Sequence, residues 1–284
     1  MTELSSTFSN NIISVEEALN RVASGNHVVF LDVRFSPKQQ DLRSDYDAEH
    51  IEGAHYVDLK TQLQGKGGGL AGSRPLPEPS ELQKNLELWG ISPDTTVVVY
   101  TKSTPAAAAR AWFVLRWAGV SNVRFLNGGL SAWKAAGGRT GTGSPATGGG
   151  TLVIDAVDHL PTLSADEIAV YILAGRKVFD ARGADGFAGD GSARSGHIPG
   201  ARNLPATRFI GSDGLLLNEV EIHKTLAAFG GDSSEAIGVY CGGGVGGALE
   251  TLALRSAGID AKLFVGSFSA WSADPSRKVA QGNE

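Results

Sequence analysis

The sequence predicts an α/β protein of two tandem domains, each a mostly parallel sheet with helices on both faces. Three observations predict this fold. Segments of the first half recur in the same order in the second half, and a glycine-rich stretch separates the halves. Within each half, short runs rich in Val, Ile and Phe alternate with helical patterns. These runs lack the polar alternation of a half-exposed strand, which is typical of parallel strands covered on both faces.

The internal repeat consists of matched segments in a constant order. The matched pairs are 28–34 with 177–182, 50–54 with 197–201, 96–101 with 236–241, 115–120 with 254–259, and 130–133 with 268–271. The offset between matched residues drifts only from 148 to 138. We therefore expect a duplicated domain, with one copy at residues 11–138 and the other at 151–284. The stretch 137–150 has the composition of a flexible linker between them.

Each half contains a buried strand followed by a helix at matching positions. Both helices end in an Ala-Gly pair, at Gly119 and Gly258, as helix C-termini commonly do. In the first half the helix has an ordinary start at Thr104 and Pro105. In the second half a glycine-rich turn takes the place of that start.

Composition indicates a soluble globular protein with room for two domains, since the 284 residues are 42% hydrophobic and 19% charged. A net charge of −5 argues against nucleic acid or an anionic membrane as the main partner. No secretory signal and no apolar run of about 18 residues is visible, so we expect no membrane span. One cysteine excludes an intrachain disulfide and suits the cytoplasm. The histidines and the cysteine show no ligand spacing, so we expect no metal and no cofactor.

The single cysteine, Cys241, is the strongest candidate for a catalytic residue. It lies where an apolar run ends, and five of the six residues 242–247 that follow are glycine. An amphipathic helix comes next, so main-chain N–H groups and the positive end of the helix dipole converge on the turn. That environment stabilises the thiolate, which is the nucleophilic form of the side chain. The alternative is a buried and inert cysteine.

The first half serves as a control for the second, because it keeps the architecture and lacks the nucleophile. Thr101 stands opposite Cys241, so we expect chemistry only in the second half. Residues present in both halves are interpreted as structural: His50 and His197 in a turn, and Asp32 and Asp180 as loop-supporting acceptors. Arg34 and Arg182 also match, which weakens the case for a substrate-binding role of Arg182.

These motifs together resemble the rhodanese family. They are Asp-x-Arg at a strand end, HIxGA, a cysteine with a glycine-rich loop, and the segment 266–271 (GSFSAW). The resemblance covers nearly the whole chain and implies an inactive N-terminal half and a catalytic C-terminal half. It implies a sulfurtransferase in which Cys241 takes a sulfane sulfur from a small anionic donor, 3-mercaptopyruvate or thiosulfate. The resulting persulfide then passes the sulfur to cyanide or to a thiol acceptor. It also implies that the main chain of six residues forms the cradle around the sulfur: Gly242, Gly243, Gly244, Val245, Gly246 and Gly247.

The loop favours 3-mercaptopyruvate over thiosulfate as the donor. Thiosulfate enzymes of the family typically carry basic residues directly after the cysteine, whereas mercaptopyruvate enzymes carry small neutral ones, as this chain does. The loop departs from the mercaptopyruvate pattern at Gly243 and Gly246, where that pattern has hydroxyl residues. In that pattern the hydroxyl at the position of Gly243 assists proton transfer, so the resemblance implies less efficient turnover of 3-mercaptopyruvate.

Arginines are expected to bind the anionic group of the donor, since a guanidinium binds carboxylate or sulfonate oxygens through two N–H groups. Arg182 has this role by resemblance. Mercaptopyruvate enzymes usually carry a second arginine four residues later, where this chain has Gly186. Arg194, which has no match in the first half, is expected to substitute for it. Arg74 falls near the place where related enzymes have a histidine.

Three other functions compete with this interpretation. A phosphatase with the C-x5-R loop lacks its arginine, because the sixth residue after Cys241 is Gly247. A dinucleotide site needs an acidic residue about twenty positions after the glycines at a strand end, and Asp260 comes too early. A catalytically weak rhodanese-like protein that relays or binds sulfur stays open as the alternative.

Overall fold

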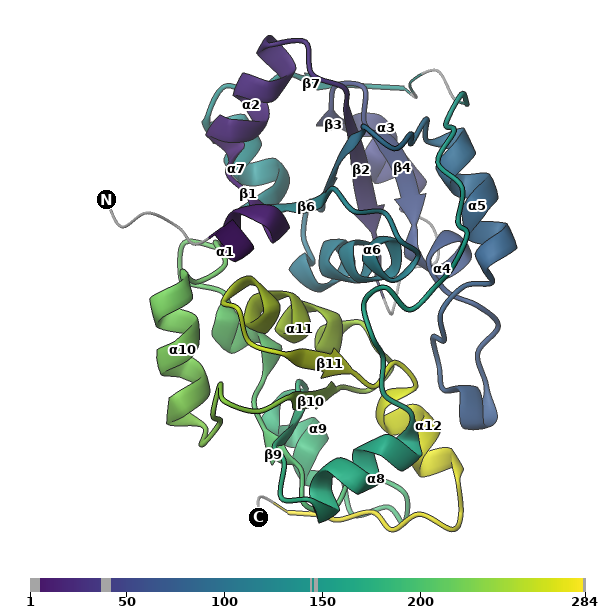
Figure 1. Ribbon diagram of the computed structural model, residues 1–284, viewed down its shortest axis with the longest axis vertical. Coiled ribbons are helices and arrows are strands. Elements are labelled where there is room, and N and C mark those ends of the chain that lie inside the picture. The colour runs from purple at the N-terminus through teal and green to yellow at the C-terminus, as the bar shows by residue number, and fades with distance from the viewer. Residues whose placement is uncertain (1–5, 37–41, 144, 146–147, 283–284) are drawn as a thin grey trace. The chain divides into compact units, whose positions relative to one another are not determined.

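The computed structural model describes residues 6–36, 42–143, 145 and 148–282, which form two compact units (Figure 1). The N-terminal unit consists of Ser9–Gln64 and Pro77–Leu160. The C-terminal unit consists of Gly65–Leu76 and the described residues from Pro161 onward, together with residues 6–8. The segment 65–76 therefore leaves the first copy of the repeat and packs with the second, which the repeat does not predict.

The N-terminal unit is built on a parallel sheet with the strand order β1-β6-β5-β2-β4. Its strands are β1 (Ile12–Ile13), β2 (Val28–Arg34), β4 (His55–Asp58), β5 (Thr96–Tyr100) and β6 (Val123–Leu126). A separate antiparallel pair joins β3 (His50–Ile51) to β7 (Thr140–Gly141). The helices are α2 (Val15–Ala23), α3 (Arg43–Ala48), α4 (Leu59–Gln62), α5 (Pro79–Leu88), α6 (Pro105–Trp117) and α7 (Gly129–Ala135), and α1 (Ser6–Asn11) precedes them.

The C-terminal unit repeats this plan with a smaller parallel sheet of order β11-β10-β8-β9. Its strands are β8 (Val178–Asp180), β9 (Arg202–Asn203), β10 (Ile237–Tyr240) and β11 (Ala261–Leu263). The helices are α8 (Ala165–Leu173), α9 (Ala184–Ala188), α10 (Glu219–Ala228), α11 (Gly246–Ser256) and α12 (Ser267–Ala273), with 3-10 turns η1 (Gly69–Ala71) and η2 (Ala206–Phe209). The predicted α/β class with mostly parallel sheets is confirmed.

Both faces of the two sheets are covered, as the unbroken apolar strands predict. Every residue of β5 and of β10 is buried, although successive side chains of a strand point to opposite faces. In the N-terminal unit, α2 and α7 enclose a cluster around Phe30 and Trp133, while α6 packs on β2, β5 and β6. In the C-terminal unit, α8 and α12 enclose a cluster around Ile168 and Trp271, while α11 packs on β10 and β11.

The predicted linker, 137–150, is partly built into the N-terminal unit. Its start forms β7, and the N–H groups of Gly148 and Gly150 donate to the carbonyls of Leu88 and Glu87, at 2.8 and 3.2 Å. Residues 144, 146 and 147 lie outside the described residues. The copy boundaries 11–138 and 151–284 stay a prediction, since residues 139–160 group with the N-terminal unit.

Candidate active site

The candidate site lies where three neighbouring parallel strands of the C-terminal unit end. In the sheet, β10 is flanked by β8 and β11, and all three run in the same direction. Arg182 follows β8, Cys241 follows β10, and Ser267 follows β11 at the start of α12. Ligands of open α/β sheets bind beyond the carboxyl ends of the strands, so this edge is where chemistry is expected.

Cys241 is held in a tight turn between β10 and α11. Only 5% of the residue is exposed. Gly244 has a φ of +81°, which favours glycine, and its N–H donates to Sγ at 3.0 Å. Within the described residues, Gly244 is the one loop residue recorded with an N–H on Sγ. The first-turn N–H groups of a helix have no partners inside the helix, so the start of α11 offers further donors to an atom attached to Sγ.

Ser267 fixes the main chain of the cysteine. Its Oγ accepts the N–H of Cys241 at 3.2 Å, donates to the carbonyl of Phe264 at 2.9 Å and lies 3.9 Å from Sγ. Ser267 has a φ of +54°, a left-handed conformation that disfavours residues with a Cβ atom. Gly129 occupies the same place in the N-terminal unit with a φ of +56°. The C-terminal unit therefore keeps a strained serine where a glycine would relieve the strain.

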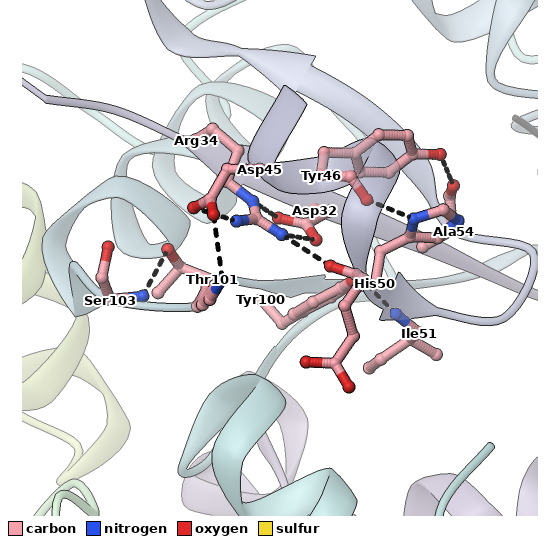
Figure 2. A network of polar contacts seen from close by, with 12 residues as sticks. Asp32, Arg34, Asp45, Tyr46, His50, Ile51, Ala54, Tyr100, Thr101 and Ser103 are labelled. Atoms are coloured by element: carbon pink, nitrogen blue, oxygen red, sulfur yellow. Dashed lines mark hydrogen bonds and ion pairs between the residues drawn. The ribbon is translucent and has the colours of Figure 1, made fainter. Parts of the chain in front are cut away.

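The N-terminal unit keeps this turn without a thiol, as Figure 2 shows around Thr101. Thr101 Oγ1 lies 3.4 Å from the N–H groups of Ser103 and Thr104, which parallels the bond from Gly244 to Sγ. The carbonyl of Thr101 accepts the N–H of Leu130 at 3.1 Å, as the carbonyl of Cys241 accepts that of Phe268 at 2.9 Å. The turn is common to both units, and the sulfur is particular to one.

The matched histidines have matched structural contacts. Nδ1 of His50 lies 2.7 Å from the carbonyl of Tyr46 and its ring stacks on the tyrosine ring, with 3.9 Å between ring centroids (Figure 2). Nδ1 of His197 lies 2.9 Å from the carbonyl of Phe187, with a stacking distance of 3.7 Å. Both rings are buried. These contacts support the structural interpretation of both histidines.

The matched arginines share one set of contacts. Arg182 donates to both carboxylate oxygens of Asp180, at 2.5 to 3.0 Å, and to the carbonyl of Gly196 at 2.6 Å. Arg34 makes the same bonds to Asp32 and to the carbonyl of Glu49. Burial lowers the pKa of Arg182, but the hydrogen bonds and charge of Asp180 outweigh this effect and hold that pKa above its ordinary value.

The two arginines differ in how much of their charge is neutralised. Nη1 of Arg34 also pairs with Asp45 at 3.1 Å, and the Arg34 side chain is 3% exposed (Figure 2). Asp45 directly precedes Tyr46, whose ring stacks on His50. In the C-terminal unit Gly186 directly precedes Phe187, whose ring stacks on His197, so Gly186 stands at the place of Asp45. Among the described residues, Arg182 consequently pairs with one carboxylate instead of two, and its side chain is 19% exposed. This contrast supports a role for Arg182 beyond holding the fold.

Arg194 is bound to the main chain around the end of α12. Its guanidinium donates to carbonyls around the end of α12, at 2.8 Å to Ser272, 2.9 Å to Arg277 and 2.6 Å to Asp274. The bond to Ser272 satisfies one of the last carbonyls of α12, which have no partners within the helix, while Asp274 and Arg277 follow the helix. The geometry gives no support to the expectation that Arg194 replaces the missing second arginine, because the side chain donates to the main chain of another segment.

Sequence reasoning passed over Glu250, which lies on α11 one turn after Gly246. The side chain is fully buried, and neither carboxylate oxygen has a hydrogen-bond partner among the described residues. Burial raises the pKa of Glu250 well above its ordinary value, and repulsion from Asp180 and Cys241 adds to the effect. A buried glutamate without a partner is therefore held as the neutral acid.

The described residues lack two other kinds of feature, a membrane-spanning helix and a metal-binding cluster. Over the described ranges, no helix combines the length and apolar character that crossing a membrane requires. The same residues contain no group of three or more His, Cys, Asp or Glu side chains placed to hold a metal ion.

Comparison with known proteins identifies the fold and its relatives. The model of the rhodanese-like domain matches twice, at residues 14–136 and 164–274. A putative thiosulfate sulfurtransferase, SseB of Mycobacterium tuberculosis, is 38% identical over 278 residues, which cover 95% of this chain and 97% of that protein. A probable 3-mercaptopyruvate sulfurtransferase of Pseudomonas aeruginosa is 34% identical over 288 residues, covering 96% and 98%. The crystal structure of SseA from Escherichia coli, described as a 3-mercaptopyruvate sulfotransferase with the rhodanese fold, has a TM-score of 0.80 at 24% identity over 90% of this chain and 98% of that one.

Proposed function

Because this chain belongs to the rhodanese-like family and is a sulfurtransferase, we propose that Cys241 carries the transferred sulfur as a persulfide. The observation that carries the proposal is the position of Sγ, 3.0 Å from the amide nitrogen of Gly244, two residues before α11 begins. The proposed donor is 3-mercaptopyruvate or thiosulfate, and the proposed acceptor is cyanide or a thiol. The catalytic unit is the C-terminal one, and the N-terminal unit, with Thr101, is inactive.

The reaction has two transfers at sulfur. In the first, the thiolate of Cys241 attacks the terminal sulfur of the donor, a new S–S bond forms, and the donor bond breaks with its electron pair on the leaving group. In the second, cyanide or a thiolate attacks the outer sulfur, and the Cys241 thiolate leaves. Each intermediate carries negative charge on sulfur, so the loop amides and the start of α11 stabilise the same species throughout.

The neighbouring groups support this chemistry. Arg182, held by Asp180 and the carbonyl of Gly196, orients the anionic end of the donor. Ser267 holds the N–H of Cys241 and thereby the direction of Sγ. The proposed role of Cys241, the single cysteine, requires that its thiolate stay reduced, which fits a cytoplasmic protein.

The test is cyanide-coupled formation of thiocyanate, with 3-mercaptopyruvate and thiosulfate assayed separately on wild type and on Cys241→Ser. We expect turnover by the wild type with at least one donor and none by the variant. Turnover by Cys241→Ser would overturn the persulfide proposal. If the wild type turns over neither donor but accepts sulfur from another protein's persulfide, the function is sulfur relay instead of small-molecule transfer.

A further inference from the structure

The segment 65–76 is fastened to the catalytic turn within the C-terminal unit. The N–H of Ser73 donates to Oγ of Ser269 at 2.8 Å. Gly72 lies directly on the main chain of Gly266, where a Cβ atom would collide with the carbonyl oxygen. Ser269 in turn donates its own N–H to the carbonyl of Gly242 at 3.0 Å. One serine of α12 therefore links the segment to the loop that follows Cys241.

This fastening places Arg74 over the loop. A Cβ atom built on Gly243 would lie 2.9 Å from Nη1 of Arg74 and 3.2 Å from Cβ of Ser73. The guanidinium therefore occupies the space that a side chain at position 243 would take. The absence of a side chain at Gly243 makes room for this arginine.

The preceding glycine has an arginine beside it as well. A Cβ atom on Gly242 would lie 3.7 Å from Cδ of Arg182. No hydrogen bond is recorded from Nη1 of Arg182 to any described residue, while its Nε and Nη2 are held by Asp180 and Gly196. Two arginines thus flank two successive residues of the loop that follows the sulfur-carrying cysteine.

We propose that Arg74 is a specificity-determining residue that, with Arg182, binds the sulfonate oxygens of a dianionic sulfur donor of the thiosulfate type. This inference rests on the proposed function and reverses the donor preference that the neutral loop predicts. The two cationic groups beside the loop are Arg74 of segment 65–76 and Arg182 after β8. A guanidinium fork matches the spacing of two sulfonate oxygens.

The proton requirements of the two donors agree with this assignment. When the Cys241 thiolate attacks thiosulfate, the S–S bond of the donor breaks, and the electron pair leaves with sulfite, a stable dianion. No proton moves, and the leaving group needs only positive charge. When the thiolate attacks 3-mercaptopyruvate, the C–S bond breaks, and the proton of the donor thiol must reach the carbon of the departing enolate.

The surroundings of the loop supply the positive charge that thiosulfate needs better than the proton transfer that 3-mercaptopyruvate needs. Positions 243 and 246 carry no hydroxyl group, because both are glycine. The nearby hydroxyl of Ser267 directs its proton to the carbonyl of Phe264. Two guanidinium groups beside the loop, with no side-chain hydroxyl on the loop to relay a proton, favour the donor whose leaving group departs as a dianion.

The test compares Arg74→Gln with Lys66→Gln, which removes the same charge from an exposed position of the same segment. The kcat/KM for each donor is measured, and so is persulfide formation at Cys241 by intact mass. We expect Arg74→Gln to lower kcat/KM for thiosulfate about 10- to 100-fold, mainly through KM, which is the effect of losing a charge-assisted hydrogen bond. The value for 3-mercaptopyruvate should change less than about threefold, and Lys66→Gln should match wild type with both donors.

Gly243→Ser is the second variant, because it leaves both arginines in the chain. Its side chain would displace the end of Arg74, a flexible group that can move without unfolding the loop. We expect it to lower thiosulfate turnover and to add little to Arg74→Gln in the double variant, since both changes remove one contact. Equal losses with both donors, or unchanged thiosulfate kinetics in both single variants, would overturn the role of Arg74. If the wild type forms no persulfide with either donor, the proposed function itself fails.

Discussion

Ser267 offers a measurement in which strain and hydrogen bonding at the site can be separated. In Ser267→Ala the residue keeps its Cβ atom and its φ of +54°, but the bonds to the N–H of Cys241 and the carbonyl of Phe264 are lost. The N–H of Cys241 then lies buried without its partner. Two lost bonds at about 1 kcal/mol each, with that group unsatisfied, predict a loss of about 2–3 kcal/mol in the free energy of unfolding.

In Ser267→Gly the same bonds are lost and the strain is relieved. The left-handed conformation costs a residue with a Cβ atom about 1–2 kcal/mol, and the greater backbone entropy of unfolded glycine offsets about 0.5–1 kcal/mol of that gain. The glycine variant should therefore be about 0.5–1 kcal/mol more stable than the alanine variant. Gly129, with a φ of +56°, is the natural example of the relieved arrangement.

Urea unfolding followed by circular dichroism measures both variants, and persulfide loading by mass spectrometry measures the site. We expect the glycine variant to load sulfur more slowly than wild type, because Ser267 no longer fixes the main chain of Cys241. Equal stability of the alanine and glycine variants would refute the reasoning about strain. Wild-type loading by both variants would refute the positioning role.

Three further changes test other contacts. At pH values between the ordinary pKa of 4.5 and the raised pKa of the folded protein, Glu250 is ionised in the unfolded chain and protonated in the folded one. The free energy of unfolding therefore falls as pH rises, by up to about 1.4 kcal/mol per pH unit. Glu250→Gln should remove that part of the slope, and urea unfolding of both proteins from about pH 5 to about pH 8 shows whether the difference grows. Gly244→Val forces a branched side chain to a φ of +81° and should slow alkylation of Cys241 by iodoacetamide, whereas an unchanged rate would contradict the cradle. Arg194→Gln should lower the free energy of unfolding by about 1–3 kcal/mol and leave kcat/KM within about twofold of wild type. A large loss of kcat/KM at unchanged stability would instead show that Arg194 acts in the active site.

The main features of the fold follow from patterns that are local in the sequence. The unbroken apolar runs of β5 and β10 predict parallel strands buried on both faces, because no polar alternation leaves one face for water. The repeat then predicts two copies, and the match of the rhodanese-like domain at residues 14–136 and 164–274 confirms them. Cys241 follows from the same comparison, since Cys241 and the glycines after it stand where the first half has Thr101 and an ordinary helix start.

Contacts between distant segments could not be predicted in the same way. Nothing local in residues 65–76 indicates that they pack with the second copy, because the bond from Ser73 to Ser269 joins residues 196 positions apart. The sequence offers Arg194 as a substitute for the missing second arginine, and only the structure shows that its guanidinium donates to carbonyls around the end of α12. The contrast between Arg34 and Arg182 depends on Asp45 and Gly186, whose equivalence becomes clear from the stacked rings that follow them.

The central claim, that Cys241 carries the transferred sulfur, is tested most directly by intact mass after brief exposure to each donor. The account predicts that wild type gains the mass of one sulfur atom, located in the peptide containing Cys241, and loses it on addition of an equivalent of cyanide with release of thiocyanate. Cys241→Ser should gain nothing. Thiocyanate production without a sulfur-loaded Cys241, or its persistence in Cys241→Ser, would contradict the account.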